Sequence, residues 1–232
     1  MVIRITETSP LVYARIAGLL YLVIIVFGVY SEVFIRSSLI VAGDATATAT
    51  NILASKGLFR IGFAADSIML LSDVAIAVLF YVLLKPVSNT LALIAAAFRL
   101  IQAAILGFNL LNYYAALLLL SGAGYSTAFE TEQHHALAML FLDMHSHGYD
   151  LGLLFFAISN FILGYLVIKS EYFPGILGYG LISAATVYLS GSFVHFLFPD
   201  YVSLFTPIYI VPLIAELSFC LWLLIKGVKA KP

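Results

Sequence analysis

The residues of this sequence that could carry out chemistry gather most densely in one short stretch, Asp143 to Asp150, which reads Asp-Met-His-Ser-His-Gly-Tyr-Asp. Two aspartates and two histidines lie close together here, and an apolar run follows them to Ile168. Carboxylates and imidazoles bind divalent metals and exchange protons. Because ionisable side chains at membrane depth are costly and usually functional, the stretch marks a candidate site.

Helical geometry divides this stretch into two faces. On a continuous helix Asp143, His147 and Asp150 fall at i, i+4 and i+7 and share one side, whereas His145 is turned away by about 200°. With His195 from a later segment, the shared side could hold zinc or another first-row divalent ion. The predicted metal ligands are His147, Asp150, His195 and Asp143.

Two other arrangements of the histidines remain open. A helix break at Gly148 would bring His145, His147 and His195 together with a carboxylate around one metal. A haem held between His145 and His195 is a further alternative. Without a metal, the same polar residues would hydrate an outer vestibule. Depth along the predicted helices groups this outer-face site as Glu32, Asn112, Asp143, His145, His147, Asp150 and His195.

A second polar set lies inside the predicted membrane spans. Counting about 1.5 Å of rise per residue places Asp73, Arg99 and Glu216 at similar depths, so that one cation meets two carboxylates. Gln102, Asn109 and Asn112 extend a polar stripe from Arg99 along one helix face. Such a network either fixes helix packing or forms an ion or proton pathway. The predicted intramembrane network is Asp66, Asp73, Arg99, Gln102, Asn109 and Glu216.

The composition shows what must position these groups. Hydrophobic residues make up 63% of the 232 residues and charged residues 10%, against roughly 45–50% and 25% in an average soluble domain. We therefore expect an all-α, polytopic transmembrane helical bundle forming a single domain over residues 1–232. The bilayer is its expected partner, and the net charge of −1 excludes a basic surface for nucleic acid.

Six spans are predicted from the apolar runs and their polar ends. An Ala/Thr-rich stretch after the first span, Ala45 to Ala54, predicts a short surface helix. The predicted spans are about 11–30, 58–84, 91–120, 135–168, 176–198 and 205–225.

Basic residues predict the orientation of these spans. Six spans place both termini on one side, and seven Lys or Arg residues fall there against three opposite. The positive-inside rule then predicts cytoplasmic termini. The seven are Arg4, Arg15, Lys85, Lys169, Lys226, Lys229 and Lys231, and the three are Arg36, Lys56 and Arg60.

Function is less specific in the sequence. The chain carries no Walker loop, no Gly-x-Ser-x-Gly, no His-Glu-x-x-His and no Gly-x-Gly-x-x-Gly, so none of these motifs indicates an enzyme. The first hypothesis is a protein that binds or transports a small molecule or ion through the polar site. The alternatives are a metal-dependent membrane hydrolase at the outer face and a structural or accessory subunit.

Four segments resemble a known family: Arg15-Ile-Ala-Gly-Leu-Leu-Tyr, the span from Asp66 to Asp73, Phe98-Arg-Leu-Ile-Gln-Ala and Leu142-Asp-Met-His. They are similar to a bacterial family of multi-spanning membrane proteins known only as domain of unknown function 4386. The resemblance runs from about Arg15 to the last span. It implies a multi-pass protein of the bacterial inner membrane and supplies no activity.

Overall fold

The computed structural model describes residues 9–122 and 129–228, and these form helices without any strand. Six helical segments are long and apolar enough to cross a membrane, which confirms the predicted all-α bundle with six spans. The four middle spans are single helices. They are α4 (Lys56–Leu84), α5 (Asn89–Leu120), α6 (Thr131–Lys169) and α7 (Gly175–Leu197).

The first and last spans are composite. The first joins α1 (Pro10–Val29), the π-helical segment η1 (Tyr30–Arg36) and α2 (Ser37–Leu39). The last joins the 3-10 turn η3 (Pro199–Tyr201), α8 (Val202–Phe205), the 3-10 segment η4 (Thr206–Tyr209) and α9 (Ile210–Ile225). Proline interrupts regular hydrogen bonding in a helix, and Pro199 and Pro207 fall in the two 3-10 pieces.

Side-chain caps set several helix starts. The Ser88 hydroxyl accepts a hydrogen bond from Leu91 N at 3.4 Å at the start of α5. Pro10 occupies the first turn of α1, where the backbone N–H that proline lacks would have no partner within the helix. The Asp44 carboxylate accepts from Ala47 N at 2.8 Å and opens α3 (Ala45–Ala54). The short helix expected in this Ala/Thr-rich stretch is therefore present.

One boundary differs from the prediction and changes the site. The first span was expected to end near Tyr30, but helical structure continues through η1 to Leu39. Arg36 was expected in a loop, and it is instead buried in the bundle. Charged residues on the extension lower its hydropathy, so an apolar run alone does not reveal it.

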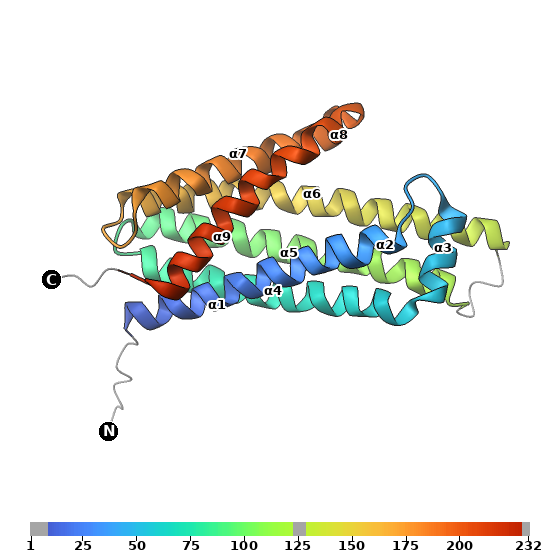
Figure 1. Ribbon diagram of the computed structural model, residues 1–232, viewed down its shortest axis with the longest axis horizontal. Helices are drawn as coiled ribbons and strands as arrows, with labels where there is room; N and C mark the ends of the chain where they lie inside the picture. The colour runs from blue at the N-terminus through green and yellow to red at the C-terminus, as the bar shows by residue number, and fades with distance from the viewer. Residues whose placement is uncertain (1–8, 123–128, 229–232) are drawn as a thin grey trace, which may run out of the picture.

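The spans lie side by side along the long axis of the molecule, with α7 packed on α6 and α9 crossing α1 (Figure 1). The crossing is close because Gly18 has no side chain: a Cβ there would lie 2.8 Å from the backbone nitrogen of Leu224. Beyond it, α9 runs away from α1, and α8 lies far from α2 (Figure 1). The two composite spans therefore diverge toward the end that carries α3 and α8.

Apolar side chains cover the outside of the bundle. Leu71, Phe108 and Ile176 are each more than 70% exposed, which in water would be unfavourable for so many large residues. The interior near the crossing is packed with aromatic rings, including Tyr21, Phe80 and Phe219. This distribution is expected for helices that face lipid.

Candidate functional site

Arg99 and Asp73 form an ion pair buried between α4 and α5. The distance from Arg99 Nη2 to Asp73 Oδ1 is 2.6 Å, and neither side chain is more than 4% exposed. The guanidinium carbon also lies 4.9 Å from the ring centre of Phe156 and 5.6 Å from that of Tyr21. Arg99 is thus held by one carboxylate and by aromatic faces that favour a cation.

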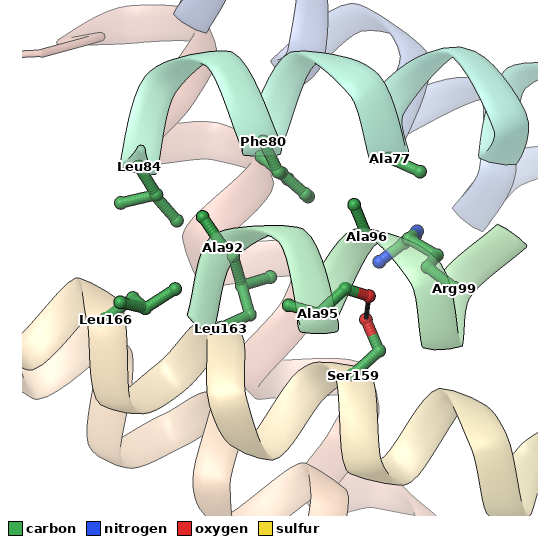
Figure 2. A pocket seen from close by; sticks show the side chains of 10 residues that line it. All are labelled: Ala77, Phe80, Leu84, Ala92, Ala95, Ala96, Arg99, Ser159, Leu163 and Leu166. Carbon is green, nitrogen blue, oxygen red and sulfur yellow. Dashed lines mark hydrogen bonds between the residues drawn. The ribbon is translucent and has the colours of Figure 1, made fainter. Parts of the chain in front are cut away.

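A small void adjoins this pair. Figure 2 shows Arg99 beside Ala96 and Ala95, with the Ser159 hydroxyl donating to Ala95 O at 2.7 Å across the α5–α6 contact. The void measures about 10 Å³, the lower limit for one water molecule. Arg99 Nη1 has no hydrogen-bond partner in residues 9–122 and 129–228, so a buried water here would satisfy it.

Glu216 does not complete the predicted three-charge cluster. Within the described residues its carboxylate has no Lys, Arg or His within ion-pair distance. Instead Asn160 Nδ2 donates to Glu216 Oε1 at 2.9 Å, and the Tyr188 hydroxyl is within hydrogen-bonding reach. Its contacts thus come from α6 and α7 rather than from Arg99 on α5.

Asp66, predicted as part of the intramembrane network around Arg99, is paired with Arg36 instead. Arg36 Nη1 lies 2.6 Å from Asp66 Oδ2, and Arg36 Nε lies 2.7 Å from Glu32 Oε2. Ser31 also accepts from Arg36 at 2.9 Å. Ser31 and Arg36 of η1 both contact α4, at Gly62 O and Asp66, whereas the Glu32 side chain is 67% exposed. Such π-helical segments occur frequently at functional sites.

In the group of residues predicted for the outer face, the structure pairs Asp150 with His195. His195 Nδ1 contacts Asp150 Oδ2, and Ser192 donates to Asp150 Oδ1 at 3.2 Å. The ring of His147 lies 4.5 Å from that of His195 between centroids, while its Nδ1 contacts Asp143 O. The backbone oxygen, rather than the carboxylate, of Asp143 thus takes part.

The helix break proposed at Gly148 is wrong. Helix α6 runs unbroken from Thr131 to Lys169, so His145 faces the bundle and His147 faces outward. Gly148 instead leaves room for the Asn109 side chain, which donates to His145 O at 2.7 Å. The alternatives that used both faces, a metal on three histidines and a haem between His145 and His195, lose their geometric basis.

The predicted metal site gains no support from these positions. Among the described residues no group of three His, Cys, Asp or Glu side chains is arranged to hold a metal ion. The nearest approach is the cluster of His147, Asp150 and His195, in which Asp150 is already engaged with His195 and Ser192. Zinc binding there stays a prediction.

A central cleft of about 860 Å³ joins the two predicted sets. Residues of α1 and η1 line one side and residues of η4 and α9 the other, with α4 to α7 between them. Six predicted site residues are not part of its lining: Asn112, His147, His195, Asp66, Asn109 and Arg99. The predicted site residues that line it are Glu32, Asp73, Gln102, Asp143, His145, Asp150 and Glu216.

Sequence reasoning missed several lining residues. Arg36 was assigned to a loop, although its i, i+4 spacing from Glu32 is typical of a helical ion pair. Tyr149, Tyr188 and Tyr209 were not selected, because tyrosines in a membrane protein are usually interfacial. Tyr209 and Glu216 are seven residues apart, a helical spacing that could have linked them.

The fold and the buried charges define the chain as a multi-pass α-helical membrane protein with a polar interior. The chain belongs to the domain of unknown function 4386 family, whose model matches residues 16–227. It is also 30% identical over 163 residues to an uncharacterized protein of the archaeon Archaeoglobus fulgidus, covering 70% of this chain and 81% of that protein. No solved structure matches the chain.

Proposed function

We propose that this protein binds a small organic molecule in the central cleft, as a step in moving it into or across the membrane. The observation that carries the proposal is the cleft itself. Its 860 Å³ fall within the roughly 300–1,000 Å³ of ordinary small-molecule sites. A purely structural or accessory subunit would not require a cleft of this size inside the bundle.

The lining supports binding of an amphipathic molecule. Ile24, Leu106 and Leu153 offer apolar surface, and charged groups lie among them at both ends of the cleft. Apolar walls with a few convergent polar groups are typical of ligand sites. The cleft is also bordered by the π-helical and 3-10 segments, where helices rearrange most easily.

Binding is testable with Nile red, a neutral apolar dye, and the purified full chain in lipid nanodiscs, after subtracting empty discs. We expect one saturable site per chain. Leu213 and Leu221 are exposed leucines of the same helix, 41% and 43% exposed, and only Leu213 lines the cleft. Leu213→Trp should weaken binding at least tenfold, and Leu221→Trp should leave it within twofold.

Equal affinities in the two tryptophan variants would contradict binding in the cleft. Thermal unfolding of both variants in detergent serves as the folding control, because each adds the same side chain to an exposed position of α9.

The proposal includes an orientation with both termini cytoplasmic in a bacterial inner membrane, so that the cleft opens outward. Arg36 is buried in the bundle and no longer counts as a loop charge, which leaves seven basic residues against two. Arg4, Lys229 and Lys231 lie outside the described residues. The start of α1 and the end of α9 lie at the same end of the bundle (Figure 1).

Reporter fusions test this orientation. A phosphatase fused after Pro232 should be inactive, and one inserted in α3, at the other end of the bundle, should be active, because phosphatase folds only outside the cytoplasm. The opposite pattern would reverse the direction in which the cleft opens.

A further inference from the structure

The inner end of the central cleft combines a carboxylate that lacks a cation with aromatic rings. Glu216 lines the cleft, is 7% exposed and has no ion-pair partner among the described residues. Tyr188 and Phe156 also line it, with ring centres 5.3 Å apart, and Tyr209 follows 6.0 Å from Tyr188. A buried carboxylate needs a proton or a cation beside it.

The polar side chains at this end also include acceptor oxygens that receive no hydrogen bond from the described residues. Gln102 lines the cleft and is 5% exposed, and its Oε1 has no hydrogen-bond partner within the described part of the chain. Its amide nitrogen is within reach of Asp73, so the oxygen is left as the free group. Behind the lining, Asn160 donates to Glu216, and its Oδ1 likewise has no partner among the described residues. Gln102 Oε1 and the Glu216 carboxylate are therefore acceptors at the inner end that a hydrogen-bond donor or a positive charge would satisfy.

The charges of the whole cleft agree with this. Five carboxyl groups line it against a single arginine, Arg36. Of these carboxyl groups, Glu32 is paired with Arg36, which also binds Asp66. Asp73 is paired with Arg99 behind the lining, and Asp150 contacts His195. Among the described residues, Asp143 and Glu216 are therefore the lining carboxyl groups without a cationic partner. The five are Glu32, Asp73, Asp143, Asp150 and Glu216.

We propose that the cleft binds an organic cation, an amine or quaternary ammonium with an apolar body, whose charged group sits at Glu216 among the rings of Phe156, Tyr188 and Tyr209. Carboxylates and aromatic faces together recognise ammonium groups. Tyr209, Leu213 and Glu216 lie at i, i+4 and i+7 along η4 and α9, so one helix face presents a ring, an apolar contact and a charge. This inference rests on the function proposed above and names the class of its ligand.

The test compares two probes of the same shape and opposite charge, tetraphenylphosphonium and tetraphenylborate, by equilibrium dialysis against the full chain in nanodiscs. Saturable binding of the phosphonium should be at least tenfold tighter than that of the borate. Glu216→Gln should weaken phosphonium binding at least tenfold. Glu132→Gln, which removes the same charge from an exposed position of α6 outside the cleft lining, should change it less than threefold.

A pair of variants at Tyr209 keeps the test informative if the Glu216→Gln protein does not fold. Tyr209→Phe retains the ring and should bind the phosphonium like the natural chain, whereas Tyr209→Leu should lose at least threefold. Borate binding as tight as phosphonium binding, or equal binding by the two Tyr209 variants, would overturn the cation assignment. If Nile red still binds in that case, the cleft remains a ligand site; if neither binds, the proposed function is wrong too.

Discussion

Arg99→Leu is expected to lower the free energy of unfolding by about 3–5 kcal/mol, the range observed when one member of a buried ion pair is removed. The replacement leaves Asp73, which is 3% exposed, without its cation in the interior. For a chain of this size each kcal/mol corresponds to roughly 2–4 °C. Thermal unfolding in detergent should therefore show a midpoint lower by roughly 6–20 °C.

The second change in a double variant identifies the partner. Adding Asp73→Asn to Arg99→Leu removes the stranded charge and should recover much of the loss, because a neutral amide costs less to bury than a carboxylate. Adding Glu216→Gln should not, since Glu216 is bonded to Asn160 rather than paired with Arg99. A neutral effect of Arg99→Leu alone would show that the pair does not stabilise the bundle.

The Asp73–Arg99 pair illustrates what depth along a helix can predict. Both residues are charged, both fall at the same depth, and an unpaired charge inside a membrane is costly. These facts sufficed to place them together, and the contact is present at 2.6 Å. Glu216 satisfies the same criteria and yet bonds to Asn160. Depth predicts only how far along the membrane normal a side chain lies. Which side chain it contacts also depends on the direction in which it points from its helix and on which helix is packed there.

Arg36 shows the limit of hydropathy. Residues Ser31 to Arg36 include two charged side chains, so an apolar window ends before them. Arg36 is buried nonetheless, because Asp66 on α4 supplies a buried counter-ion for it. Only the tertiary pairing makes this segment compatible with the membrane, and the pairing cannot be inferred from either segment separately.

The cleft results from the way in which α1 and α9 pack, which the sequence alone does not predict. Gly18 lets α1 approach the backbone of α9 at Leu224, and the irregular segments η1 and η4 continue from there on diverging paths (Figure 1). Glycines in membrane helices are common, so Gly18 alone does not mark a crossing. The six helices could thus be predicted, but the space that brings Glu32, Asp73 and Glu216 to one lining could not.

The two carboxylates of Arg36 should differ sharply in their effect on stability. Asp66 is 2% exposed and lies 2.6 Å from Arg36, so Asp66→Asn leaves a buried guanidinium underpaired and should cost about 3–5 kcal/mol. The side chain of Glu32 is 67% exposed at almost the same distance, and water screens such a pair, so Glu32→Gln should cost at most about 1 kcal/mol. Thermal unfolding of the two variants in the same detergent measures the contrast, and each change removes one carboxylate from the same arginine. Equal shifts in the two variants would mean that Arg36 is hydrated through the cleft, and that the π-helical segment does not depend on α4 for its charge balance.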